Sequence, residues 1–167
     1  MSIDNLSKDD LIKMMKMFSK DYLALDGLWF LGVEDKYGLD AAIQIDLKVW
    51  ERLGSIEVRR IKQTFDINEG GIASIVNALQ LSPVWICYGY EFPELMENKA
   101  VFRIINCVPQ EARVRNNRGE FPCKPVDLAY MTTFAKTIDP KAKVRCIQAP
   151  PDRHLNGVWC EWEILIE

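Results

Sequence analysis

The first part of the chain carries apolar side chains at steps of three and four residues, the spacing of one helix face. This stripe consists of Leu11, Met14, Met15, Phe18, Tyr22, Leu25, Trp29 and Val33. Ser7 and Asp10 are spaced as an N-cap and its partner three residues on. The pattern predicts a helix from Ser7 to about Tyr37, with Gly27 and Gly32 as the points where a bend or interruption is expected.

A second periodic stretch follows Gly38, a residue type well suited to end a helix. It runs from about Asp40 toward Phe65, so the two stretches predict an antiparallel hairpin of long helices. The polar, glycine-containing segment 68–71 breaks the pattern. Residues 72–81 then predict a shorter third helix that stops before a proline.

The remaining chain is rich in segments of β-branched and aromatic residues. Segments 84–92 and 100–108 predict two strands of a hairpin. Residues 109–125, which contain three prolines, predict a long loop. Residues 126–137 predict a helix, and 143–167 a second hairpin with strands at 143–148 and 157–167.

The order of these elements predicts an α+β fold. We expect the N-terminal helix hairpin and the short third helix to pack on an antiparallel sheet of about four strands, with one further helix. The chain is expected to form a single α+β domain, with a helical half at 1–82 and a sheet half at 83–167.

Composition narrows the classes of function. The chain has 167 residues, of which 49% are hydrophobic and 27% charged, as in ordinary globular proteins. A formal net charge of -3 offers no positive field to nucleic acid. The apolar run 28–33 is far shorter than the roughly 20 residues of a membrane helix, and residues 1–10 lack the apolar region of a secretory signal. We expect a cytoplasmic protein with neither nucleic-acid nor membrane partners.

The five cysteines are an odd number and are expected to be reduced. They are interpreted as apolar core groups, metal ligands or reactive thiolates. Cys146 and Cys160 are expected opposite each other on the apolar side of the second hairpin. Cys87 and Cys107 are expected close together in the first hairpin, with Cys123 arriving on the loop, so that up to four thiols converge.

A metal site would use Cys146, Cys160 and Cys123 with His154, the only histidine. Zinc is the ion that such thiolate and imidazole ligands favour. The spacing Cys-x7-His-x5-Cys matches no established zinc signature. The alternative is that the strand cysteines belong to the core and that His154 is a solvated turn residue.

Cys123 is the candidate nucleophile, because it lies in the predicted loop beside Lys124, a cation that would lower the pKa of its thiol. The motifs of the common nucleotide-binding, protease and esterase mechanisms are absent from the sequence. The chain has no glycine-rich phosphate loop, no His-Glu-x-x-His motif and no Gly-x-Ser-x-Gly motif.

In the second predicted helix Asp46 and Arg60 fall within the apolar stripe, and Glu57 adjoins it. Asp26 borders the stripe of the first helix in a comparable way. Carboxylates that face each other from the two helices, Asp26 or Glu34 on the first and Asp46 or Glu57 on the second, would form a general acid/base pair or a cation site. The alternative is that Asp46 or Glu57 pairs with Arg59 or Arg60 and orients the helix hairpin.

A set of residues spread over nearly the whole chain resembles an uncharacterised family of bacterial and archaeal cytosolic proteins. The set consists of Leu25-Asp26-Gly27-Leu28-Trp29, Glu34, Tyr37-Gly38, Asp46, Val49-Trp50-Glu51, Arg59-Arg60-Ile61, Phe121-Pro122-Cys123-Lys124-Pro125, Thr133-Phe134-Ala135-Lys136-Thr137-Ile138-Asp139-Pro140, Cys146, Pro150-Pro151-Asp152 and Cys160. That family is in turn similar to the L-2-amino-thiazoline-4-carboxylate hydrolase family and the 4-vinyl reductase domain. The resemblance implies helices packed on an antiparallel sheet, a small-molecule site, and cysteines that bind a metal or ligand.

The leading hypothesis is a protein that binds a small molecule between the helix hairpin and the sheet. The expected ligand-binding residues are Trp29, Trp50, Arg60 and Trp162, with the thiols of Cys123, Cys146 and Cys160 at one side. One alternative is a hydrolase of a cyclic amidine or thiazoline-type bond, which would use Cys123 or a thiolate-bound metal with Asp46 or Glu57 as base. The other alternative is a structural homodimer formed through the long helices.

Overall fold

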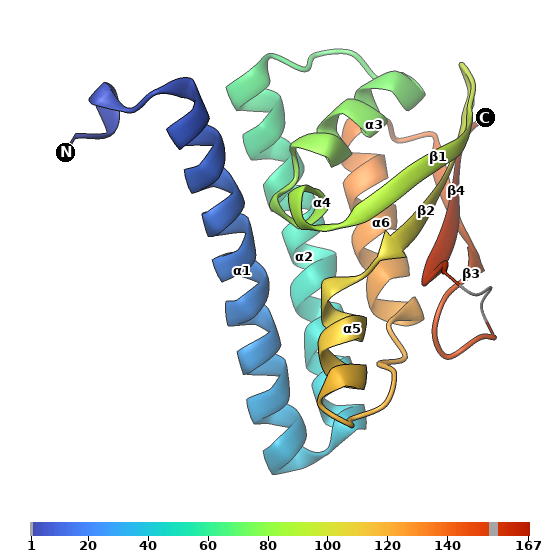
Figure 1. Cartoon of the computed structure of the whole chain (residues 1–167). Helices are drawn as coiled ribbons and strands as arrows, with labels where there is room; N and C mark the ends of the chain where they lie inside the picture. Colours follow the sequence, from blue (N-terminus) through green and yellow to red (C-terminus); the bar gives the residue numbers. More distant parts are fainter. Residues whose placement is uncertain (1, 154–156) are drawn as a thin grey trace.

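The computed structural model describes residues 2–153 and 157–167. The two long helices predicted from the N-terminal pattern are present (Figure 1). After a 3-10 turn at Ile3–Asn5, helix α1 spans Lys8–Tyr37 and helix α2 spans Leu39–Phe65. They lie side by side and are joined directly through Gly38, so the predicted hairpin of helices is confirmed.

Local interactions explain where these two helices begin and end. Ser7 accepts a hydrogen bond from the backbone N–H of Asp10, which confirms the predicted N-cap of α1. Gly38 has a φ of 88°, a conformation that glycine adopts without the steric cost a side chain would bring. Helix α1 continues through Gly27 and Gly32, so the expected interruption is wrong. A single glycine costs a helix only about 1 kcal/mol, which a helix packed along much of its length tolerates.

The third predicted helix is also present, as α3 at Gly71–Leu81. The strand predicted to begin at residue 84 is wrong in its first part, because α4 occupies Pro83–Cys87 and strand β1 spans Gly89–Leu95. Proline at the first position of a helix has a suitable φ and lacks only an N–H that would be unpaired there. The proline that was expected to stop α3 therefore also starts the next helix.

The two predicted hairpins form one antiparallel sheet of four strands in the order β1-β2-β4-β3. Strand β2 spans Lys99–Asn106, β3 spans Ala142–Gln148 and β4 spans Cys160–Ile166. The hairpins join through β2 and β4. Three pairs of opposed residues across this junction point toward the helices: Ala100 with Ile164, Phe102 with Trp162, and Ile104 with Cys160.

The region predicted as a long loop contains helix α5 at Val108–Arg115. Its second residue is Pro109, so here too a proline begins a helix instead of closing a strand. The loop is therefore confined to residues 116–123. Helix α6 at Lys124–Ile138 confirms the last predicted helix.

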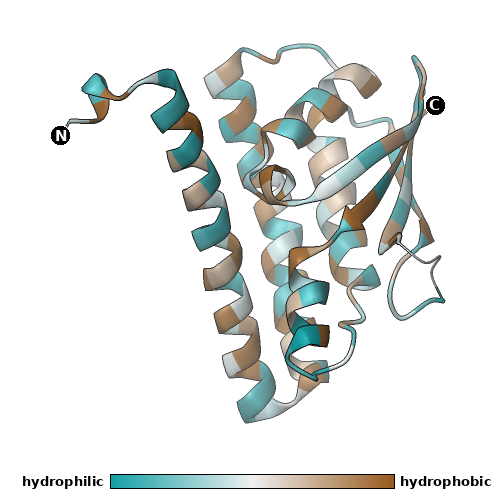
Figure 2. Cartoon of the chain, in the orientation of Figure 1, coloured by the Kyte–Doolittle hydropathy of each residue, from teal (hydrophilic) through white to brown (hydrophobic). Residues whose placement is uncertain are grey.

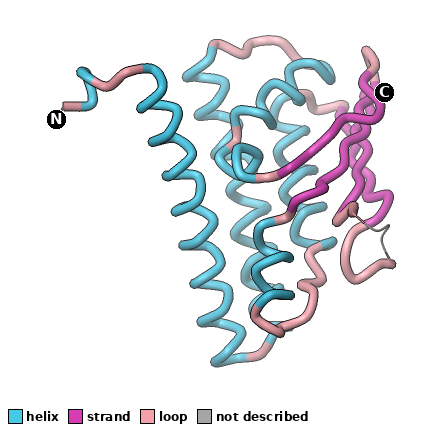
Figure 3. The backbone as a smooth tube through the Cα atoms, in the orientation of Figure 1, coloured by secondary structure: helices cyan, strands magenta, loops and turns pink. Residues whose placement is uncertain are grey.

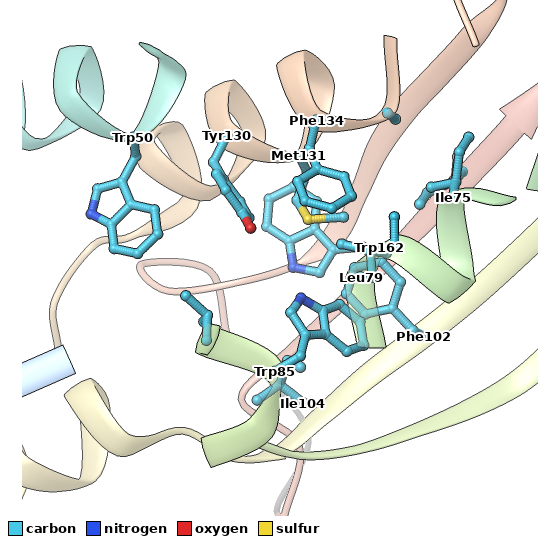
Figure 4. Close-up of a cluster of buried hydrophobic side chains, with 14 of the residues drawn as sticks. Trp50, Ile75, Leu79, Trp85, Phe102, Ile104, Tyr130, Met131, Phe134 and Trp162 are labelled. Atoms are coloured by element: carbon cyan, nitrogen blue, oxygen red, sulfur yellow. The ribbon is translucent and has the colours of Figure 1, made fainter. Parts of the chain in front are cut away.

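The helices cover one face of the sheet, which confirms the predicted α+β class (Figures 1 and 3). Helix α6 packs against both α2 and β3, while α4 and α5 contact α1. The apolar side chains of this layered core include Trp85, Phe102, Phe134 and Trp162 (Figure 4). Hydrophobic segments, brown in Figure 2, occur in both the helices and the sheet. No helix within the described ranges is long and apolar enough to cross a membrane.

The opposite face of the sheet is held by ion pairs. Arg103 of β2 bonds to Glu161 of β4 at 3.0 Å, and Arg145 of β3 bonds to Glu163 at 3.0 Å. Lys99 also contacts Glu163, at 3.4 Å. These charges form ion pairs with one another on a face of the sheet that no described helix covers.

Candidate functional site

A cavity of about 530 Å³ lies between the helices and the sheet. Helices α1, α2, α4, α5 and α6 and strands β2 and β4 all contribute to its wall. Charged, sulfur-containing and amide side chains of the wall include Asp26, Asp46, Cys107, Gln110, Arg113, Arg118, Cys123, Asp127 and Cys160. Ligand sites in proteins have volumes of roughly 300–1,000 Å³, so this space is large enough for an organic molecule.

Aromatic rings make up much of the wall. Trp50 of α2 and Tyr130 of α6 meet edge to face with their centroids 5.2 Å apart, and Trp85 of α4 meets Phe102 at 5.0 Å (Figure 4). Trp162 of β4 lines the same cavity. Their mutual contacts hold these rings in place, so the apolar wall is largely formed before any ligand arrives.

Three carboxyl groups from three helices border the cavity: Asp26 of α1, Asp46 of α2 and Asp127 of α6. The pKa of Asp46 is raised to about 8, mainly by burial and in smaller part by the negative charges of Asp26 and Asp127. Burial likewise raises the pKa of Asp26 to about 6 and that of Asp127 to about 6. The Trp50 indole acts as a hydrogen-bond donor toward Asp26 and Asp46 and opposes part of the shift.

Three thiols lie in the same wall: Cys107, Cys123 and Cys160. The Cys123 thiol donates a hydrogen bond to Asp127, which lowers the pKa of that carboxyl against the effect of its burial. Gln110 donates to the Phe121 carbonyl at 2.6 Å and to the Cys123 sulfur at 3.5 Å, which fixes the loop that carries this thiol. Burial, together with the nearby Asp127 charge, holds the pKa of Cys123 well above its usual value.

The expectation that Cys123 is an accessible, activated thiol is therefore wrong. Only 7% of this residue is exposed. The cation expected to activate it, Lys124, forms a salt bridge at 2.6 Å with Asp152. The sequence neighbourhood suggested a loop cation beside the thiol, but the start of α6 turns the two side chains toward different partners.

The strand cysteines share a face of the sheet but are not directly opposed. Cys146 stands opposite Trp162, and Cys160 stands opposite Ile104 on the other neighbouring strand. Cys146 is half-buried and does not border the cavity. Cys87 lies at the end of α4 and does not border the cavity. Burial raises the pKa of its thiol, and the charge of Lys20 opposes part of this shift.

The expected zinc site gains no support from the described residues. In the ranges 2–153 and 157–167, no three side chains of histidine, cysteine, aspartate or glutamate are arranged to hold a metal ion. The predicted ligand His154 lies outside the described residues. The thiols that do gather at the cavity are Cys107, Cys123 and Cys160, without Cys146.

Of the carboxyls expected to face each other from the two long helices, Asp26 and Asp46 both border this cavity, whereas Glu57 does not. Glu57 lies three turns further along α2, where it accepts a hydrogen bond of 3.0 Å from the Tyr130 hydroxyl. It borders a smaller pocket of about 230 Å³ together with Tyr22 and Arg60. The alternative salt bridges to Arg59 or Arg60 do not form either: within the described structure no salt bridge involves Asp46 or Glu57.

Two of the expected ligand-binding residues lie elsewhere. Trp29 is 71% exposed on the outer side of α1, because Asp26 and Phe30 are the residues of that turn that face the cavity. Arg60 is exposed and borders only the smaller pocket. The predicted residues that the structure does bring together are Trp50, Trp162, Asp46, Cys123 and Cys160.

Sequence reasoning missed several parts of the wall. Asp127 follows Pro125 in the first turn of α6, where an acidic residue is usually explained by the helix dipole alone. Trp85 belongs to a segment predicted as a strand. Asp26, by contrast, carried a signal, because it stood beside the apolar stripe of its helix in the same way as Glu57 stood beside the second stripe.

The fold and this cavity define a class: an α+β protein in which helices cover one face of an antiparallel sheet and enclose an aromatic, acidic cavity. Within that class, the chain belongs to a Family of unknown function (DUF6125), which matches residues 4–166. This agrees with the resemblance to an uncharacterised family. No protein of curated function matches the chain.

Proposed function

We propose that this protein binds a small molecule in the cavity between its helices and its sheet. The observation that carries the proposal is the cavity itself: about 530 Å³, with a wall that is mainly apolar and aromatic and holds a few converging polar groups. This combination is typical of sites for organic ligands. We also propose a cytoplasmic location, because the five cysteines are free and such thiols persist in a reducing compartment.

Two glycines of α1 provide a matched test of this proposal. Gly27 borders the cavity, and a Cβ at Gly27 or at Gly32 meets no atom within 4 Å. Gly32, five residues further along the same helix, is exposed and does not border the cavity. Because Gly27 borders the cavity and its Cβ position is open, we expect a leucine there to take up ligand space, whereas a leucine at position 32 should not.

The measurement is a fluorescence titration with 1-aminoanthracene, a neutral apolar probe. We expect saturable binding to the original protein and to Gly32→Leu, and at least tenfold weaker binding to Gly27→Leu. Thermal unfolding of both variants provides the check that they are folded. Equal binding by all three proteins, or no saturable binding by the original protein, would refute the proposal.

A second candidate function is hydrolysis of a cyclic amidine or thiazoline-type bond, favoured by the pKa of about 8 for Asp46 at the cavity wall. A carboxyl with a pKa near neutrality exchanges protons readily with a substrate. The thiol mechanism is disfavoured, since burial raises the pKa of Cys123. The test is hydrolysis of 2-amino-2-thiazoline, followed by mass spectrometry. Turnover that is lost in Asp46→Asn supports this candidate. No product from the original protein excludes hydrolysis of this substrate, and equal product from both proteins excludes Asp46 as the base.

The homodimer through the long helices remains a proposal of its own. Met15, Phe18, Leu25 and Trp29 are each at least half exposed on one side of α1, a larger apolar face than a solvated helix needs. The proposed occupant is the same face of a second copy. Light scattering should then give a molar mass of two chains for the original protein, and the Trp29→Lys variant should have the mass of a single chain. A single-chain mass for the original protein at high concentration excludes the dimer.

A further inference from the structure

The polar groups of the cavity are unbalanced in charge. Asp26, Asp46 and Asp127 approach it from three different helices. Asp46 is only 8% exposed, yet no salt bridge joins it to any lysine or arginine of the described residues, and the same is true of the other two. A buried carboxylate without a cationic partner is costly to fold, so proteins usually pair it or use it.

The basic side chains at the wall are already engaged with other acids. Arg113 donates to both carboxylate oxygens of Glu34, at 2.6 and 3.1 Å, and to the carbonyls of Gly119 and Arg118. Arg118 donates to Asp35 at 2.8 Å. Neither guanidinium is among the influences on the pKa values of the three carboxyls. The partner charge is therefore not supplied by the wall itself.

The apolar part of the wall suits a cation as well. The rings of Trp50, Trp85, Tyr88, Tyr130 and Trp162 border the cavity. The face of an aromatic ring attracts a cation within about 6 Å of its centroid, most strongly for tryptophan and when water is excluded. Trp50 lies beside two of the carboxyls, so one cationic group placed there would meet oxygen acceptors and a ring together.

We infer that the ligand of this cavity is a small organic cation, a protonated amine on an apolar body, held by Asp26, Asp46 and Asp127 and by the surrounding aromatic rings. This inference rests on the proposed binding function and adds the class of ligand to it. A bare metal ion fits less well. Metal ions such as calcium take six to eight oxygen ligands, and no three metal-binding side chains of the described ranges are arranged for one.

Binding of a cation has a consequence for protons. At neutral pH the empty site holds a proton on Asp46, since burial and the two neighbouring charges raise the pKa of this carboxyl to about 8. A cation beside the group favours its charged form and lowers that pKa. Amine binding at pH 7 should therefore release part of a proton to the solvent.

The experiment compares three probes of matched size and different charge: 2-phenylethylamine, 2-phenylethanol and 3-phenylpropionate. Isothermal titration calorimetry at pH 7 gives the affinities, and repetition in Tris and in phosphate gives the protons released. We expect the amine to bind at least tenfold more tightly than the alcohol, with fractional proton release, and the acid to bind more weakly than either.

The Asp46→Asn variant keeps the shape of the side chain and should remove both the preference for the amine and the proton release. Asp26→Asn, on a different helix, should reduce the preference and guards against a folding defect specific to position 46. The matched control is Glu51→Gln, because Glu51 is exposed on the same helix as Asp46 and does not border the cavity. It should behave like the original protein.

Several results would overturn the inference that the ligand is an organic cation. Equal affinity for the amine and the alcohol, or tighter binding of the acid, overturns it, and the proposed function then stands or falls on the separate titration with neutral 1-aminoanthracene. Failure of all three probes also overturns it. An amine preference that survives in both Asp46→Asn and Asp26→Asn overturns the assignment to these carboxyls.

Discussion

At the scale of single residues, Asp46 is buried, and among residues 2–153 and 157–167 no lysine or arginine forms a salt bridge with it. The charged form of this side chain is disfavoured in the folded protein by burial and by Asp26 and Asp127. Its pKa of about 8 compares with 3.8 for a free aspartate. The folded protein therefore keeps a proton that the unfolded chain releases. As the pH rises from about 4 to about 8, the contribution of Asp46 to the free energy of unfolding falls.

The first prediction follows from the free-energy cost of ionising the buried Asp46 carboxyl. Asp46→Asn should raise the free energy of unfolding at pH 8 by about 1–2 kcal/mol, because an amide of the same shape carries no charge to bury. The variant should also lose part of the decline in stability between pH 4 and pH 8. Denaturant unfolding at several pH values measures both effects, with Glu51→Gln as the control. A variant less stable than the original protein at pH 8 would show that the Asp46 carboxylate has a stabilising partner.

The second prediction concerns Cys123. Because this thiol is buried and its pKa is raised, we expect it to react slowly with a disulfide reagent at pH 7.5 in the native protein. Its labelling should accelerate strongly when denaturant unfolds the chain. Peptide mapping of partly labelled protein gives the rate at each of the five cysteines. Rapid native labelling at Cys123, ahead of the half-buried Cys146, would contradict the burial described above.

At the scale of elements, the shape of the cavity depends on how closely α2 and α6 approach. Gly54 of α2 lies where a Cβ would be only 2.8 Å from the backbone oxygen of Tyr130 and 3.1 Å from the backbone nitrogen of Phe134. Neither backbone atom can turn away as a side chain can. The contact therefore sets the spacing of the two helices that carry Asp46 and Asp127.

The third prediction tests this contact. Gly54→Ala should destabilise the protein by about 1–3 kcal/mol, because the added methyl group must push α2 and α6 apart. Gly32→Ala is the matched control, since glycine at that helical position meets open space and alanine there should stabilise the protein by up to about 1 kcal/mol. Thermal or denaturant unfolding measures both. Equal effects of the two substitutions would contradict the proposed role of Gly54.

At the scale of the whole molecule, the sequence pattern predicted the class and the order of most elements, because three- and four-residue steps and alternating strands are local signals. It failed at Pro83 and Pro109, where proline starts α4 and α5. A proline is compatible with both the end of one element and the start of the next, and the tertiary contacts of α4 and α5 with α1 decide between them.

The site was predicted only in part for a related reason. Trp50, Trp162 and Asp46 stood on apolar faces whose direction can be read from periodicity. Trp29 stood on a stripe of α1 that the fold leaves exposed in part, including Trp29 itself. Asp127 joined the site only because α6 packs beside α2. Which helix face meets which neighbour is a property of the assembled layers, and no local pattern specifies it.

The tryptophans allow the most direct test of the central claim that this cavity is a binding site. Trp50, Trp85, Trp159 and Trp162 border the cavity, whereas Trp29 is exposed on the outer side of α1. Indole N–H signals in a ¹H–¹⁵N NMR spectrum report on each ring separately, once single Trp→Phe variants assign them. On titration with 1-aminoanthracene, the account predicts saturable shifts of the Trp50, Trp85 and Trp162 signals while that of Trp29 stays in place. Shifts confined to Trp29, or none at saturating probe, would contradict it.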